Sequence, residues 1–173
     1  MGVRRATVDD AEAIEHVRVE TWRATYRGLL PDALIDGLRE NAHQRRERLR
    51  IQAAHEFVFV ADEGDTVVGF AVGGPERTGD ADYRGEVYAI YVLPAHQRKG
   101  IGRALIRECA RELAKGKTRS LLIWVLRENA RGRGFYERLG GLAVREKPVE
   151  EFPGAEEYVE IGYGWNDTSR LRA

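Results

Sequence analysis

The chain of 173 residues contains one cysteine, Cys109, and no long apolar run. A single thiol cannot form an internal disulfide, so nothing in the chain depends on an oxidising compartment. No stretch reaches the about 20 apolar residues that cross a bilayer, and the first ten residues lack the apolar run of a secretory signal. We therefore expect a soluble protein with a cytoplasmic location and no membrane partner.

An excess of charge of one sign is also missing. The 28 Lys and Arg residues balance the 28 Asp and Glu residues, so the formal net charge is zero. Proteins that coat nucleic acid or an anionic membrane depend on a basic surplus. The arginines of the RGRG segment at 131–134 are too few to predict an RNA-associated protein, and we expect no nucleic-acid partner.

Nothing in the sequence divides it into several domains. Internal repeats, low-complexity tracts and linkers are absent, and 173 residues suffice for one hydrophobic core. We assign one domain to residues 1–165 and expect a polar C-terminal tail at 166–173. The four histidines lack metal-ligand spacing, so no metal is predicted.

The hydrophobic pattern predicts a series of short strands and helices. Strands are expected at 3–7, 57–61, 67–72, 86–93, 121–126, 142–146 and 158–164. Helices are expected from 7 to 26, from 32 through the charged segment at 42–50, over 100–114 and over 129–139. We interpret the charged segment as a solvated helix face and Cys109 as an inert core residue. Strands that alternate with helices between terminal hairpins indicate an α/β fold with one mixed sheet.

The end of the strand at 86–93 and the start of the following helix form a candidate anion site. Gly100 and Gly102 let the backbone approach a ligand closely, and the unpaired N–H groups of a helix N-terminus favour negative charge. Arg98, Lys99 and Arg103 add positive charge at the same place. This combination predicts a pyrophosphate-binding loop.

Two other nucleotide-binding loops fail on spacing. A dinucleotide fingerprint requires a third Gly or Ala where this chain has Leu105. A phosphate-binding loop of the Walker type is suggested by the GKT run at 116–118, but its first glycine would fall on Arg111.

The run QRKGIG at 97–102 resembles the Gln/Arg-x-x-Gly-x-Gly/Ala signature of the GNAT superfamily of N-acetyltransferases. Asn129, followed by FYERLG at 135–140, resembles the second signature of that superfamily, and the two motifs have the expected order and separation. The resemblance extends over essentially the whole chain in element order. It implies a GNAT fold: a single mixed, mostly antiparallel sheet with a splay between the fourth and fifth strands and helices on both faces.

The resemblance also implies acetyl-CoA as co-substrate, with no metal. The pyrophosphate would bind the backbone of Arg98, Lys99, Gly100, Ile101, Gly102 and Arg103. The pantetheine arm would pair, like an added strand, with the backbone of Ile90, Tyr91 and Val92. The same resemblance implies that Gln97 closes the loop. Asn129 either contacts the pantetheine or holds the splay, and a helix N-cap is its alternative role.

The resemblance implies transfer of an acetyl group to a primary amine by direct attack in a ternary complex. Tyr136 resembles the tyrosine that protonates the departing thiolate, and its alternative is a packed aromatic beside Phe135. Glu86 lies eleven positions before Gln97, which is the register of the glutamate base in the histone-acetylating members. Its alternative is an exposed carboxylate at a strand start.

A small-molecule or peptide amine is the expected acceptor. Trp22 and Tyr26 are four positions apart and share a helix face, either as an aromatic wall for the acceptor or as core packing. The segment 149–160 joins the two closing strands, and its acidic residues predict a cationic acceptor unless they belong to a solvated loop: Glu150, Glu151, Glu156, Glu157 and Glu160. A non-catalytic acyl-CoA-binding or sensor protein is the alternative function, and a homodimer is compatible with either.

Overall fold

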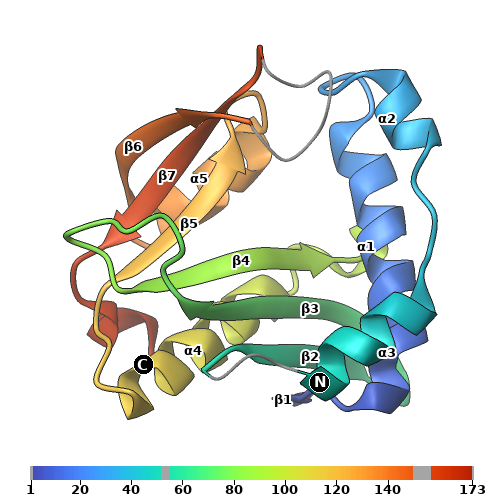
Figure 1. The fold of residues 1–173 in the computed structure, drawn as a ribbon, viewed down its shortest axis with the longest axis horizontal. Coiled ribbons are helices and arrows are strands. Elements are labelled where there is room, and N and C mark those ends of the chain that lie inside the picture. The colour runs from blue at the N-terminus through green and yellow to red at the C-terminus, as the bar shows by residue number, and fades with distance from the viewer. Residues whose placement is uncertain (1, 52–54, 150–156, 173) are drawn as a thin grey trace.

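Seven strands form one sheet in the order β1-β2-β3-β4-β5-β7-β6. The structure is a computed structural model and describes residues 2–51, 55–149 and 157–172 (Figure 1). The strands are β1 (Gly2–Arg5), β2 (Phe57–Glu63), β3 (Thr66–Pro75), β4 (Gly85–Val92), β5 (Leu121–Leu126), β6 (Leu142–Pro148) and β7 (Val159–Trp165). All neighbouring pairs are antiparallel except β4 and β5. The predicted mixed, mostly antiparallel sheet is confirmed.

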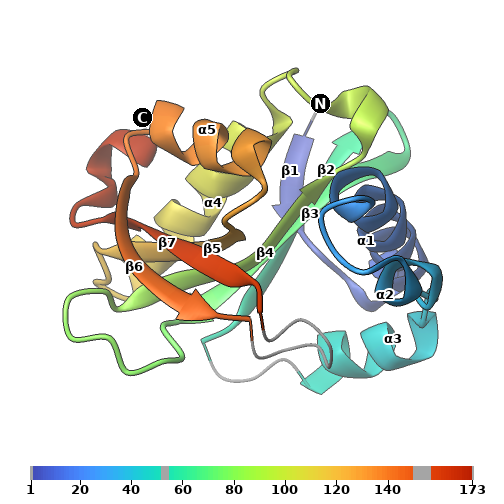
Figure 2. The same cartoon turned by 90° about the horizontal axis from the view of Figure 1, so that it is seen from above.

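Helices cover both faces of the sheet, as Figure 2 shows from above. On one face lie α1 (Ala11–Tyr26), α2 (Asp32–Asp36) and α3 (Ala42–Ile51). The other face carries α4 (Ile101–Lys115) and α5 (Ala130–Arg138). The short 3-10 helices are η1 (Val8–Asp10), η2 (Pro94–His96) and η3 (Thr168–Leu171). The fold is therefore a three-layer arrangement with the sheet in the middle.

The N-terminal helical region differs in detail from the sequence prediction. The expected pairing of Thr7 with Asp10 is present, but it caps η1, which leads directly into α1. The single helical region predicted from Asp32 onward is two helices. The Asn41 side chain accepts a hydrogen bond from the backbone N–H of Gln44 at 3.0 Å, and this cap starts α3 as a separate element.

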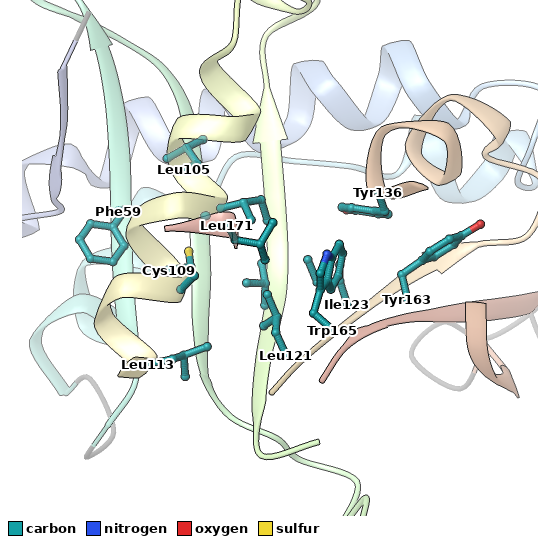
Figure 3. Close-up of a cluster of buried hydrophobic side chains, with 14 of the residues drawn as sticks. Phe59, Leu105, Cys109, Leu113, Leu121, Ile123, Tyr136, Tyr163, Trp165 and Leu171 are labelled. Atoms are coloured by element: carbon teal, nitrogen blue, oxygen red, sulfur yellow. The ribbon is translucent and has the colours of Figure 1, made fainter. Parts of the chain in front are cut away.

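The main core lies between the sheet and α4, as Figure 3 shows. Leu105, Cys109 and Leu113 recur every four residues, are buried under the sheet and belong to one cluster with Leu121 and Ile123 of β5. Burial raises the pKa of the Cys109 thiol far above its usual range, so the thiol stays protonated and unreactive. Each such buried aliphatic side chain stabilises the fold by about 1.5–3 kcal/mol.

The residues after β7 also contribute to this core. Leu171 of η3 is only 8% exposed and belongs to the same cluster (Figure 3). The backbone N–H of Thr168 donates to the carbonyl of Arg119 at 2.8 Å. This part of the expected polar tail is thus packed against the domain.

The parallel pair β4 and β5 is joined over a short distance. Residues 85–87 of β4 pair with 121–123 of β5, and beyond this point the strands diverge (Figure 1). The register of β4 against β3 also shifts between Val72 and Gly73, which places a β-bulge at Tyr88 on β4. The splay and the bulge lie on the same stretch of β4 and position the candidate site.

Candidate active site

A cavity of about 670 Å³ lies between the diverging ends of β4 and β5, and we call it the splay cavity. It is lined by parts of α1, β4, the loop before α4, the first turn of α4, β5 and α5. Most of the residues that the sequence singled out line it: Tyr26, Ile90, Tyr91, Val92, Gln97, Arg98, Gly100, Gly102, Arg103, Asn129 and Tyr136. Residues distant in the sequence therefore converge on one cavity.

The loop before α4 presents backbone to this cavity. Gly100 is the N-cap of α4 with a left-handed φ of 84°, and no side chain caps the helix. A Cβ atom at Gly100 would meet no atom within 4 Å, so the space beside it is open. The Gln97 side chain donates from Nε2 to the carbonyl of Val92 at 2.9 Å and closes the loop as expected. The uncapped N–H groups of the helix start are suited to an anion.

The side chains of the loop divide between the cavity and other surroundings. Arg98 and Arg103 line the cavity. Lys99 does not line it and has its nearest carboxylate, that of Glu63, at 3.9 Å. Ile101 is 2% exposed and packs into the core, so only its backbone is available to a ligand.

Four tyrosines and one asparagine line the splay cavity: Tyr26, Tyr88, Tyr91, Tyr136 and Asn129. Asn129 caps α5, because its Oδ1 accepts from the backbone N–H of Gly132 at 2.9 Å, and its side chain also hydrogen-bonds to Tyr26. Burial, followed by the proximity of Tyr91 and Tyr136, raises the pKa of Tyr26 well above its usual value. Asn129 thus links α5 to α1 across the splay.

Tyr136 is both a packed aromatic and a cavity residue. It is 6% exposed, and its ring centroid lies 5.8 Å from that of Tyr163 and 6.3 Å from that of Trp165 (Figure 3). Burial, with a contribution from Tyr91, raises the pKa of its phenol far above the usual value. The hydroxyl therefore stays protonated at neutral pH, which is the state that a proton donor requires.

Glu86 is placed differently from the other predicted site residues. It does not line the splay cavity, and it is 1% exposed, so the alternative of an exposed carboxylate is wrong. The Arg77 guanidinium donates to Glu86 Oε1 at 2.7 Å, and the Arg77 backbone N–H donates to Oε2 at 3.1 Å. Hairpin pairing of Pro75 with Gly85 brings Arg77 over this carboxylate. These contacts favour a structural role over that of a base.

A second cavity of about 600 Å³ lies between α1, α3 and the sheet, and we call it the helix-side cavity. Tyr88, Ala89 and Tyr91 of β4 line both cavities, so the two meet at this strand. Trp22 lines the helix-side cavity and Tyr26 the splay cavity, with ring centroids 4.7 Å apart. The predicted aromatic pair stands between the two cavities and also packs on a cluster around α2.

Sequence reasoning missed the arginines of the helix-side cavity. Four arginines and one carboxylate line it: Arg18, Arg45, Arg48, Arg77 and Glu56. The charged segment of α3 has no buried residue, as expected for a solvated face, yet Arg45, Arg48 and Leu49 face this cavity. Their spacing of three and four residues on one helix face was the available signal.

The acidic segment predicted to border the acceptor is only partly described. Glu150, Glu151 and Glu156 lie outside the described residues. Glu157 is exposed, and Glu160 is within 3.6 Å of the Lys147 ammonium. Neither lines the splay cavity or the helix-side cavity.

No group of three or more His, Cys, Asp or Glu side chains among residues 2–51, 55–149 and 157–172 is arranged to hold a metal ion. Within the same ranges, no helix has the length and apolar character needed to cross a membrane.

The sequence model of the acetyltransferase (GNAT) family matches residues 17–141. The chain belongs to this family. The uncharacterized N-acetyltransferase YuaI of Bacillus subtilis (strain 168) is 36% identical over 171 residues, which are 98% of this chain and 95% of that protein. The chain is therefore a GNAT N-acetyltransferase, as the two signatures predicted.

Solved acetyltransferase structures share the fold. The PaiA N-acetyltransferase of Thermoplasma acidophilum, solved in complex with coenzyme A, has a TM-score of 0.72 at 23% identity over 94% of this chain and 96% of its own. YncA of Salmonella typhimurium, solved with acetyl-CoA, has a TM-score of 0.72 at 22% identity, with 95% and 92% covered. The predicted fold is confirmed.

Proposed function

We propose that this GNAT enzyme acetylates a primary amine of a small molecule or peptide by direct attack in a ternary complex. The observation that carries the proposal is the meeting of two cavities at Tyr88, Ala89 and Tyr91. Acetyl-CoA would occupy the splay cavity while the amine enters from the helix-side cavity. Because two separate cavities reach the same strand, both substrates can be bound at the same time, which direct transfer requires.

The residues of the splay cavity fit coenzyme A. The open space beside Gly100, the uncapped start of α4, and Arg98 and Arg103 suit the pyrophosphate. Beyond the three residues that pair with β5, the edge of β4 is left for the pantetheine arm along residues 90–92. Gln97 holds the loop to β4 by its bond to Val92.

The co-substrate supplies a thioester. The free amine nitrogen bonds to its carbonyl carbon and releases one proton to solvent, the carbon–sulfur bond breaks, and the electron pair leaves on sulfur. We assign Tyr136 to donate its phenolic proton to that thiolate, because its hydroxyl is protonated at neutral pH and its ring lines the cavity. Removal of the amine proton by Glu86 stays a prediction, and the contact with Arg77 argues against it.

Release of free thiol from acetyl-CoA tests this proposal. A panel of primary amines should give amine-dependent thiol release and an acetylated amine detectable by mass spectrometry. The alternative, a non-catalytic acyl-CoA sensor, predicts coenzyme A binding by calorimetry without amine-dependent thiol release. We also propose a cytoplasmic location, because a chain with a single cysteine does not depend on an oxidising compartment.

A further inference from the structure

The helix-side cavity contains two arginines that share one carboxylate. Arg18 and Arg45 each place a guanidinium nitrogen 2.7 Å from an oxygen of Glu15. The side chains of Arg45 and Glu15 are 11% and 5% exposed. The Glu15 carboxylate compensates only one of the two positive charges. Arg18, Arg45 and Glu15 together therefore retain a net positive charge at the cavity wall.

Arg48 adds a second positive charge to the same wall. It lies three residues after Arg45 on α3 and, although exposed, lines the same cavity. Within the described ranges, no carboxylate lies within salt-bridge distance of Arg48. The carboxylate of Glu56 lines the cavity. Glu15 is ion-paired with both Arg18 and Arg45, and Glu86 is ion-paired with Arg77. Of the described residues that line the cavity itself, four are arginines and one, Glu56, is a carboxylate.

The remaining wall of the cavity is apolar. Trp22, Leu49, Phe70 and Val72 line it, and the Arg45 guanidinium lies 5.7 Å from the centroid of the Phe70 ring. Apolar walls lower the local dielectric constant and strengthen the attraction between an arginine and an anion. Guanidinium groups bind carboxylate and phosphate through paired hydrogen bonds.

We propose that the acceptor is a primary amine that also carries a carboxylate or phosphate group. Arg48, with Arg45 beside it, binds the anionic group, and the amine reaches Tyr88 and Tyr91, where the cavities meet. This inference rests on the proposed function, because it assigns the acceptor to the helix-side cavity. It opposes the cationic acceptor that the acidic segment predicts.

Matched acceptors test the anionic group directly. We expect kcat/KM for leucine to exceed that for leucinamide and isopentylamine by about 10-fold or more, and phosphoethanolamine to be compared with ethanolamine in the same way. The first comparison reports a carboxylate and the second a phosphate. Leucinamide has the larger fraction of free amine at neutral pH, so a preference for leucine cannot come from amine protonation. A preference for the acceptor without the anionic group in both comparisons, or for spermidine over all of them, would overturn the inference.

Arg48→Gln tests the proposed contact. We expect KM for the preferred anionic acceptor to rise about 5- to 10-fold, with kcat and the KM for acetyl-CoA within about 2-fold. Arg50→Gln is the matched control, because Arg50 lies on the same helix, pairs with Glu47 and does not line the cavity. Raising salt from about 50 to about 500 mM should weaken acceptor capture by the wild type more than by Arg48→Gln.

Failure of this inference and failure of the proposed function give different results. If neutral or cationic amines are acetylated best and Arg48→Gln behaves like Arg50→Gln, the anionic acceptor is wrong and the acetyltransferase proposal stands. If coenzyme A binds and no amine of any charge releases thiol, the proposed function fails and this inference fails with it.

Discussion

The two cavities that meet at β4 present different groups to a ligand. The splay cavity presents backbone: the left-handed Gly100, the uncapped start of α4 and the edge of β4. The helix-side cavity presents side chains, chiefly arginines and aromatics from α1, α3, β3 and β4. A backbone site depends on one local conformation, whereas a side-chain site divides its binding among several groups. Single substitutions should therefore have larger effects in the splay cavity.

Gly100→Glu should produce the largest effect. The substitution places a side chain and a negative charge in the open space beside the loop, so we expect acetyl-CoA affinity to fall about 1,000-fold by calorimetry. Gly79→Glu is the control, because Gly79 also has a positive φ, 77°, and open space around it but does not line the splay cavity. Unchanged affinity in a folded Gly100→Glu variant would remove the pyrophosphate assignment.

Tyr136→Phe should lower kcat about 100-fold while leaving coenzyme A affinity within about 3-fold. The ring keeps its contacts with Tyr163 and Trp165, and only the proton donor is lost. Steady-state kinetics with the best amine, together with calorimetry, measure the two quantities. Wild-type turnover in this variant would leave Tyr136 with packing as its role.

Glu15→Gln should affect the helix-side cavity without changing acetyl-CoA affinity. Burial opposes ionisation of Glu15, but hydrogen bonds from Arg18 and Arg45 outweigh it and hold its pKa below the usual value. A carboxyl whose pKa is lowered by folding stabilises the protein above its unfolded pKa of about 4.3, and this contribution is lost as pH falls through the lower folded value.

Thermal unfolding of Glu15→Gln at two pH values checks this. We expect a loss of about 2 kcal/mol near pH 7, or about 4–8 °C in Tm, which shrinks as the pH falls below about 4. Glu12→Gln is the control on the same helix, because its side chain is 74% exposed in its pair with Arg46. A deficit that is equal at neutral and acidic pH would show that the ion pairs are not its source.

Glu86→Gln should have the smallest effect. Its Arg77 partner is 48% exposed and can turn to water, so we expect a loss of about 1 kcal/mol and a Tm lower by about 2–4 °C. The pH–rate profile should keep its shape. A rate loss concentrated near neutral pH, where little free amine is present, would instead establish Glu86 as the base.

The splay cavity was predictable because its parts are short runs of sequence. Residues 97–103 encode a loop and a helix start through their glycines, and Asn129 precedes a helix that it caps. The helix-side cavity was not predictable, because whether Arg48 lines a cavity depends on how α1 packs against α3. The alternative of an exposed carboxylate at Glu86 is wrong because burial, too, depends on tertiary packing. Arg77 covers it through hairpin register, which strand propensity does not specify.

The three-residue junction between β4 and β5 has a consequence for aggregation. Where the strands part, one sheet acquires two unpaired edges, and such edges invite pairing with strands of other molecules. Here the edges face each other across the splay cavity, flanked by α1 on one side and α5 on the other. Neither is offered to another protein strand. The opening that admits the thioester arm is thereby protected from self-association.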